Sequence, residues 1–157
     1  MNKLKNIWYA VRFKANEIDR FERNLDNQNF IFYIPKLTKK SKVFALFPGY
    51  GFIKHTNIGL NALRYTRGLI NIVKFGDNYA FVEEDIIYEL KALEEASKVK
   101  PIEDFLVGDE ISIKSGPFKD YISKIISLPS QDRITVLLNI LGSKKSLTFS
   151  IDSVKKT

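Results

Sequence analysis

About 95 residues on the N-terminal side alternate between strand-type and helix-type hydrophobic patterns, and this alternation constrains the fold more than any other feature. Runs rich in β-branched and aromatic residues are expected to form strands: 8–13, 30–34, 50–53, 70–75 and 79–82. Segments with apolar residues at helical spacing are expected to form helices: 17–28, 57–68 and 83–96. Elements in this order imply a sheet that helices cover on at least one face.

Short-range signals predict where some of these elements begin and end. Asn16 and Asn57 stand where a side-chain oxygen can cap the first turn of a helix. Gly68 stands where a helix commonly ends in a left-handed residue. The segment 36–42 is basic and polar and follows Pro35, so we expect a hairpin or a loop at the surface.

The C-terminal third fits two secondary structures. Four β-prone runs are separated by turns that contain Gly or Pro: 110–114, 122–128, 134–140 and 147–151. Two stripes also repeat at the helical period: Phe118, Tyr121, Ile122, Ile125 and Ile126, then Ile134, Leu137, Leu138 and Leu141. The period does not decide between a small barrel and a helical hairpin, so both stay open.

The change of pattern predicts two domains. They are residues 1–98 and 106–157, joined by a linker at 99–105 that contains Pro101 and has no hydrophobic period.

Positive charge is concentrated in the first half of the chain. The sequence carries 25 Lys and Arg against 18 Asp and Glu, and residues 1–74 alone carry 14 against 4. A strongly basic segment usually binds a polyanion, because each neutralised phosphate releases counterions. We therefore expect a nucleic-acid partner, and a merely solvated basic surface is the alternative interpretation.

The composition excludes several classes of enzyme. The chain has no cysteine and a single histidine, His55, which excludes thiolate metal sites, a histidine pair for zinc and a cysteine nucleophile. The apolar run near the N-terminus is too short for a signal peptide or a membrane span. We expect a cytoplasmic protein that is not an enzyme, with no cofactor, no metal and no membrane partner.

Several short motifs occur in an order that resembles the NusG family of transcription elongation factors. In the N-terminal part they are 8–11 (WYAV), 46–53 (LFPGYGFI), 66–69 (TRGL) and 73–76 (VKFG). In the C-terminal part the segments 108–113, 115–118 and 137–142 resemble the KOW domain of that family. The resemblance covers nearly the whole chain and implies an α+β protein, with an NGN-type α/β sandwich followed by a five-stranded KOW barrel.

Within this family the C-terminal segment is most similar to the specialised RfaH-like branch, because 137–141 (LLNIL) resembles its leucine-rich segment. This implies a C-terminal domain that docks as a helical hairpin and refolds to a barrel when released. Arg133 matches an arginine that ties the hairpin down through a glutamate, but Phe44 stands at the position of that glutamate. The docked hairpin is therefore expected to rest on apolar packing alone.

The resemblance assigns roles to individual residues. The pocket for the clamp helices of the largest RNA polymerase subunit is assigned to Tyr50, Phe52 and Phe75. The surface that reads the exposed non-template DNA strand is assigned to Lys14, Arg20, Asn24, Asn27, Gln28, Thr66 and Arg67. Contacts between the domains are assigned to Ile125, Arg133, Leu137 and Leu138, and contact with ribosomal protein S-ten to Leu141.

Each role has an alternative in the residues themselves. The aromatic set also fits a strand face in a core, the polar helix face fits a solvated surface, and Leu141 fits core packing. Arg and Lys hold phosphates while Asn and Gln bond base edges, so the DNA role is chemically reasonable, and Tyr65 can add a stacking face.

The sequence therefore predicts a monomeric transcription elongation and antitermination factor that suppresses pausing and termination and couples transcription to translation. Two alternatives stay open. One is a KOW-type RNA-binding module of a ribonucleoprotein, and the other is a general NusG-like factor that binds a termination factor.

Overall fold

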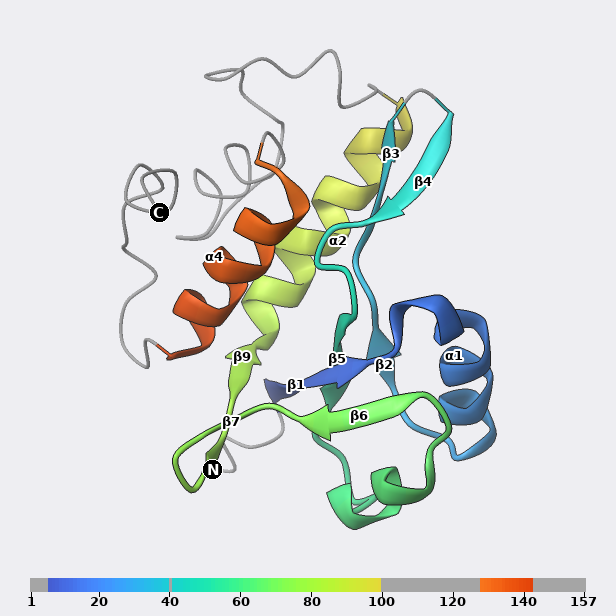
Figure 1. Cartoon of the computed structure of the whole chain (residues 1–157), viewed down its shortest axis with the longest axis vertical. Helices are drawn as coiled ribbons and strands as arrows, with labels where there is room; N and C mark the ends of the chain where they lie inside the picture. The colour runs from blue at the N-terminus through green and yellow to red at the C-terminus, as the bar shows by residue number, and fades with distance from the viewer. Residues whose placement is uncertain (1–5, 40, 100–127, 143–157) are drawn as a thin grey trace. The chain divides into compact units, whose positions relative to one another are not determined.

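The computed structural model describes residues 6–39, 41–99 and 128–142 of the 157-residue chain (Figure 1). The chain divides into two compact units. Unit 1 consists of Met1–Ile34 and Gly49–Glu84, and unit 2 consists of Pro35–Pro48 and Asp85–Thr157. Each unit therefore combines segments that are distant in the sequence.

Unit 1 is built on an antiparallel sheet with the strand order β2-β5-β1-β6, in which β9 also pairs with β1 (Figure 1). Its strands are β1 (Ile7–Phe13), β2 (Phe32–Tyr33), β5 (Tyr50–Lys54), β6 (Leu69–Ile72) and β9 (Phe81–Glu83). A separate short hairpin joins β7 (Lys74–Phe75) to β8 (Asn78–Tyr79). The almost wholly apolar sequence of β1 fits its central place, because this strand has neighbours on both edges.

One hydrophobic cluster of unit 1 lies on one face of this sheet. Helix α1 (Ile18–Asn27) follows the short 3-10 helix η2 (Ala15–Glu17), and a second 3-10 helix, η3 (Leu60–Tyr65), lies between β5 and β6. Alternate residues of β1, Val11 and Phe13, pack in one cluster with Phe21 and Leu25, which lie one turn apart on α1. The Phe13 and Phe21 rings stack with 4.8 Å between their centroids.

Unit 2 contains a β-hairpin and two helices. The hairpin pairs β3 (Lys36–Lys39) with β4 (Lys42–Ala45), and the helices are α2 (Glu84–Val99) and α4 (Ser130–Gly142). Lys39 pairs with Lys42 across a two-residue turn, in which Ser41 has a φ of 65°. A positive φ is typical of the turns whose twist matches that of two hairpin strands.

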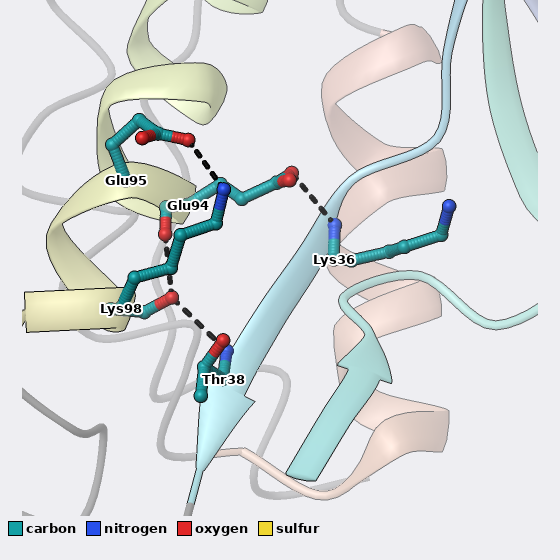
Figure 2. Close-up of polar contacts among 6 residues, drawn as sticks. Lys36, Thr38, Glu94, Glu95 and Lys98 are labelled. Carbon is teal, nitrogen blue, oxygen red and sulfur yellow. Dashed lines mark hydrogen bonds and ion pairs between the residues drawn. The ribbon is translucent and has the colours of Figure 1, made fainter. Parts of the chain in front are cut away.

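Side chains of α2 bind the outer edge of β3 (Figure 2). The Lys36 N–H donates to Glu94 Oε1 at 3.1 Å, and the Thr38 N–H donates to the hydroxyl of the fully buried Ser97 at 3.0 Å. These two residues alternate along β3, as the pleat requires for N–H groups that point away from the partner strand. Side chains of α2 thereby accept the N–H groups on the outer edge of β3, which would otherwise be free to pair with another strand.

The structure confirms the predicted alternation but corrects both predicted caps. Asn16 lies inside η2, where the Glu17 N–H donates to the Lys14 carbonyl at 2.8 Å, so a tight turn leads into α1 without a side-chain cap. Asn57 does not cap η3 either, because that helix begins after Gly59. The basic segment 36–42 forms the β3–β4 hairpin, and Gly68 has the expected positive φ.

In the C-terminal part the described residues form a helix. Ser130–Gly142 is α4, so the second apolar stripe is helical and the strand predicted at 134–140 is not present in this structure. Arg133, Leu137 and Leu141 lie one turn apart and are all buried, which is the physical reason for the helical period. The first stripe, which includes Ile125, lies outside the described residues. So do the other predicted C-terminal strands, apart from Leu128 at the end of one of them.

The predicted linker and the KOW domain also fall mostly outside the described residues. Helix α2 ends at Val99, and residues 100–127 and 143–157 carry the rest of these predictions. The boundaries 1–98, 99–105 and 106–157 therefore stay predictions, as does the barrel. No helix within the described segments has the length and hydropathy needed to cross a membrane.

Replacing Gly68 tests the packing of unit 1. Gly68 has a φ of 91°, and a Cβ there would lie 3.1 Å from the Phe21 Cβ. We expect Gly68→Ala to lower the free energy of unfolding by about 1–3 kcal/mol, because the left-handed backbone and the close contact are both strained by a methyl group. Urea unfolding of the full chain measures this change.

Gly59→Ala is the matched control. Gly59 has a φ of −70° and no neighbour within 4 Å of an added Cβ, so the free energy of unfolding should stay the same or rise slightly. Equal effects of the two substitutions would contradict the proposed strain at position 68.

Candidate functional site

The predicted DNA-binding residues of unit 1 are brought together by contacts between α1 and the segment that follows η3. The Thr66 hydroxyl donates to Gln28 Oε1 at 2.5 Å, which joins this segment to the end of α1. The Lys14 N–H donates to the Gly68 carbonyl at 2.8 Å, which joins it to the residues between β1 and η2. The segment Thr66–Gly68 is thereby joined to the distant stretch of sequence from Lys14 to Gln28, and together they form one surface, which we call the α1 surface.

Most of the predicted side chains on the α1 surface are accessible. Arg20, Asn27 and Arg67 are exposed, as is Lys14, while Asn24 and Gln28 are half-buried. Thr66 is only 5% exposed, and in this structure its hydroxyl positions Gln28. The DNA-binding role of these residues stays a prediction, and the geometry brings them within one unit.

The basic residues of the α1 surface are only loosely paired. Glu17 lies 3.8 Å from both the Lys14 Nζ and an Arg20 nitrogen. Exposed ion pairs of this length contribute little stability, typically below about 1 kcal/mol. Replacing Glu17 by a phosphate as the partner of Lys14 and Arg20 would therefore cost little free energy, and a phosphate forms stronger charge-assisted hydrogen bonds.

The predicted polymerase-binding aromatics do not form one cluster. The register pairs Arg12 with Tyr50 and Ala10 with Phe52, so both aromatics lie on the sheet face opposite the α1 core. Phe52 is 1% exposed and Tyr50 is half-buried. Phe75 is 41% exposed in the separate β7–β8 hairpin. No ring contact among the described residues joins Phe75 to the other two.

His55 has a structural partner rather than a catalytic arrangement. Its Nδ1 lies 2.9 Å from the Tyr9 hydroxyl, and the Tyr9 ring meets the Tyr79 ring edge to face at 5.9 Å. Burial raises the pKa of Tyr9 above its usual value of 10, and Tyr79 adds to the rise, so the phenol stays neutral at physiological pH. Over the described ranges, no cluster of His, Asp and Glu is suited to hold a metal ion.

Glu84, the last residue of unit 1, contacts the sheet of that unit. One of its carboxylate oxygens accepts from the Trp8 indole N–H at 3.0 Å and lies 3.1 Å from the Lys54 Nζ. The Lys54 ammonium also lies 5.9 Å from the centroid of a Trp8 ring. These contacts occupy Lys54 within the fold, so it is not a free cation for a ligand.

Arg133 holds the start of α4 to the end of β4 within unit 2. It is 8% exposed, and its Nε donates to the Leu46 carbonyl at 2.7 Å while one terminal nitrogen donates to the Leu128 carbonyl at 2.7 Å. A longer contact of 3.4 Å reaches the Ala45 carbonyl, and the guanidinium carbon lies 5.4 Å from the Phe44 ring centroid. Burial lowers the pKa of Arg133, but a guanidinium stays charged at physiological pH.

These contacts correct the expectation that α4 rests on apolar packing alone. Phe44 lacks a carboxylate, yet it still contacts Arg133 through the face of its ring. The carbonyls of Leu46 and Leu128 supply the acceptors. Sequence analysis missed them because every residue has a backbone carbonyl, so this kind of partner leaves no signal in the sequence.

The other predicted interdomain residues are placed only in part. Leu137 is buried and Leu138 is half-buried on α4, whereas Ile125 lies outside the described residues. Leu141, predicted to contact ribosomal protein S-ten, is buried on the same helix. In this conformation Leu141 therefore contributes to packing and offers little surface to a partner.

Comparisons with known proteins agree on one family. The family model described as "Transcription termination factor nusG" matches residues 6–91, more than half of the chain. The "Transcription termination/antitermination protein NusG" of Staphylococcus aureus strains Mu50 and N315 is 23% identical over 173 residues, which cover 95% of this chain and 94% of the relative.

A solved structure, described as "Domain interaction in Thermotoga maritima NusG", aligns with 76% of this chain and 78% of its own, with 18% identity and a TM-score of 0.45. The family match over residues 6–91 decides the assignment, because it spans the sheet of unit 1 together with the hairpin of unit 2. The chain belongs to the NusG family of transcription termination and antitermination factors, which are not enzymes.

Proposed function

We propose that this protein is a transcription elongation and antitermination factor that binds RNA polymerase and the exposed non-template DNA strand in the cytoplasm. The observation that carries the proposal is the α1 surface, where Lys14, Arg20 and Arg67 lie with amide side chains in one compact unit. Arginine and lysine bind phosphates of any sequence, while amides hydrogen-bond base edges. A surface with both groups suits a strand whose bases are unpaired.

The polymerase contact is proposed for Tyr50, Phe52 and Phe75, with the clamp helices of the largest subunit as the partner. Exposed aromatic side chains commonly anchor protein interfaces. Tyr50 and Phe75 have accessible surface, whereas Phe52 is buried in the described conformation. Full engagement of this set therefore requires a rearrangement that exposes Phe52.

The C-terminal domain is proposed to supply that rearrangement by switching between two states. In the state described here, 130–142 is helical and held by Arg133. In the proposed second state the domain forms a KOW barrel, in which Leu141 faces ribosomal protein S-ten. The burial of Leu141 in α4 supports this separation of states, because the docked helix offers little of that side chain.

Removing the accessible aromatics tests polymerase binding. We expect Tyr50→Ala combined with Phe75→Ala to weaken binding to RNA polymerase at least ten-fold, because aromatic anchors carry much of an interface's free energy. Affinity for free single-stranded DNA should change less than two-fold, since neither residue lies on the α1 surface. Fluorescence anisotropy with labelled protein and purified polymerase, and separately with DNA, measures both.

Tyr88→Ala is the control, because Tyr88 is an exposed aromatic on α2 outside the predicted set. If the double variant Tyr50→Ala/Phe75→Ala loses polymerase binding and DNA binding together, the proposed polymerase pocket is contradicted. An RNA-binding module, in which one surface binds every ligand, is then favoured. Retention of polymerase binding by the double variant would remove these aromatics from the interface.

Replacing Arg133 tests whether α4 is a releasable element. We expect Arg133→Ala to speed amide hydrogen exchange in 130–142 at least ten-fold, because it removes charged hydrogen bonds worth about 1.5–3 kcal/mol. Exchange in α1 should be unchanged. If release exposes the aromatic set, polymerase affinity rises in the same variant.

Salt provides an independent check on the same contact. The acceptors of Arg133 are neutral carbonyls rather than carboxylates. Salt at about 0.5 M screens exposed ion pairs strongly, but it should leave amide hydrogen exchange in α4 nearly unchanged. Fast exchange of α4 in the unmodified protein at low salt would contradict a docked helix.

A further inference from the structure

We propose that Tyr65 is a stacking platform for one unpaired nucleotide base, with Arg64 and Arg67 holding the flanking phosphates. The inference rests on the proposed binding of single-stranded DNA and assigns a specific contact within it. It develops the stacking face that the sequence suggested for Tyr65, and it names the chemical group that this residue recognises, the face of an unpaired base.

The exposure of Tyr65 is the first observation. Its side chain is 78% exposed, and no other aromatic side chain among the described residues is as accessible. An aromatic ring left in water forgoes the burial free energy that the same ring gains in a core. The ring instead offers two faces and a hydroxyl to a ligand.

The backbone that carries Tyr65 is fixed on both sides. The preceding Leu63 is fully buried, and the following Thr66 is 5% exposed and donates its N–H to the Leu63 carbonyl at 2.9 Å. The Thr66 hydroxyl is bonded to Gln28, and Gly68 lies against Phe21. Because the backbone is already ordered, binding costs only the freedom of the two side-chain torsions of Tyr65, which favours an effective platform.

The charges around Tyr65 favour a polyanion. Arg64 and Arg67 are exposed, and no carboxylate of the described residues forms an ion pair with either of them. No acidic residue occurs in the sequence between Asp26 and Asp77, so this segment adds no local negative charge. Arginines beside a stacking ring are the combination with which proteins bind single strands.

Gln28 adds a polar group beside the platform. Its Oε1 accepts the Thr66 hydroxyl, so the amide nitrogen is the group that it offers to a ligand. In Asn24 the roles are reversed, because its amide nitrogen donates to the Arg20 carbonyl at 2.8 Å and its oxygen is the group left to accept. The Gln28 amide nitrogen is thereby a donor next to Thr66, the neighbour of Tyr65, and a hydrogen bond from it to a base edge would affect base preference more than overall affinity.

A single strand fits these observations better than a duplex. In a duplex the faces of the bases are stacked on each other, so an exposed ring finds no face to cover. The competing partner for an exposed Tyr is another protein, namely the polymerase itself. The two are separated by testing free DNA and polymerase in parallel.

The test measures DNA binding by the full-length protein. Fluorescein-labelled oligodeoxynucleotides, one single-stranded and one duplex of the same sequence, are titrated and followed by anisotropy. We expect Tyr65→Ala to weaken single-strand binding about ten-fold, Tyr65→Phe to keep it within about two-fold, and neither to alter duplex binding by more than about two-fold. Arg67→Ala should weaken binding to both and lower the salt dependence by about one phosphate contact.

The matched control is Tyr88→Ala, which removes another exposed tyrosine and should leave both affinities unchanged. Thermal unfolding of each variant should match the parent, because an exposed side chain contributes little to stability. A series of single-strand probes with one abasic site locates the stacked base, since at that position the parent and Tyr65→Ala should bind equally.

The outcomes separate this inference from the function on which it rests. If the parent protein binds single-stranded DNA and Tyr65→Ala binds it equally well, the platform is overturned while DNA binding stands. If Tyr65→Ala loses polymerase affinity and keeps DNA affinity, the ring is a protein contact and the platform is again overturned. If the parent protein does not bind single-stranded DNA at all, both the proposed DNA-binding function and the Tyr65 platform fail.

Discussion

The pairing of β1 on both of its edges is the constraint on which unit 1 depends. One edge is taken by β5 and the other by β6 and β9, so a single strand carries most of the sheet. Because successive residues of a strand point to opposite faces, β1 divides the unit into two sides. Val11 and Phe13 face the core with α1, whereas Arg12 faces the side of Tyr50 and Phe52. Helix α1 and the pair Tyr50 and Phe52 therefore lie on opposite faces of the same sheet.

Side chains that bind backbone groups complete the structure where secondary elements end. Glu94 and Ser97 accept the N–H groups on the free edge of β3 (Figure 2). Arg133 donates to carbonyls at the end of β4. The Thr66–Gln28 bond serves the same purpose between η3 and α1. A buried backbone group without a partner costs about as much as a lost hydrogen bond, so each of these contacts stabilises a particular arrangement of segments. Apolar packing alone would permit more than one such arrangement.

The candidate contact residues differ in accessibility, and this difference bears on how the protein works. The α1 surface is open, with Arg20, Asn27 and Arg67 in solvent. Phe52 and Leu141 are buried in the same structure. On the proposed function, a protein in this conformation would meet DNA before it offers these two apolar side chains to other partners. An order of binding of this kind needs no catalytic group, in keeping with a family whose members are not enzymes.

The sequence by itself determined the alternation of strands and helices in the first unit, the left-handed Gly68 and the family, because local periodicity, turn chemistry and ordered motifs depend on neighbouring residues. For the basic segment 36–42, which forms a hairpin in the structure, it left a hairpin and a loop open. It did not determine the caps, which a 3-10 turn at Ala15–Glu17 made unnecessary, or the choice between strand and helix at 134–140. That choice came from tertiary structure, because the same apolar residues fit both periods. It depends on what Arg133 and its neighbours contact, and the partners of Arg133 include backbone carbonyls that no side-chain pattern reveals.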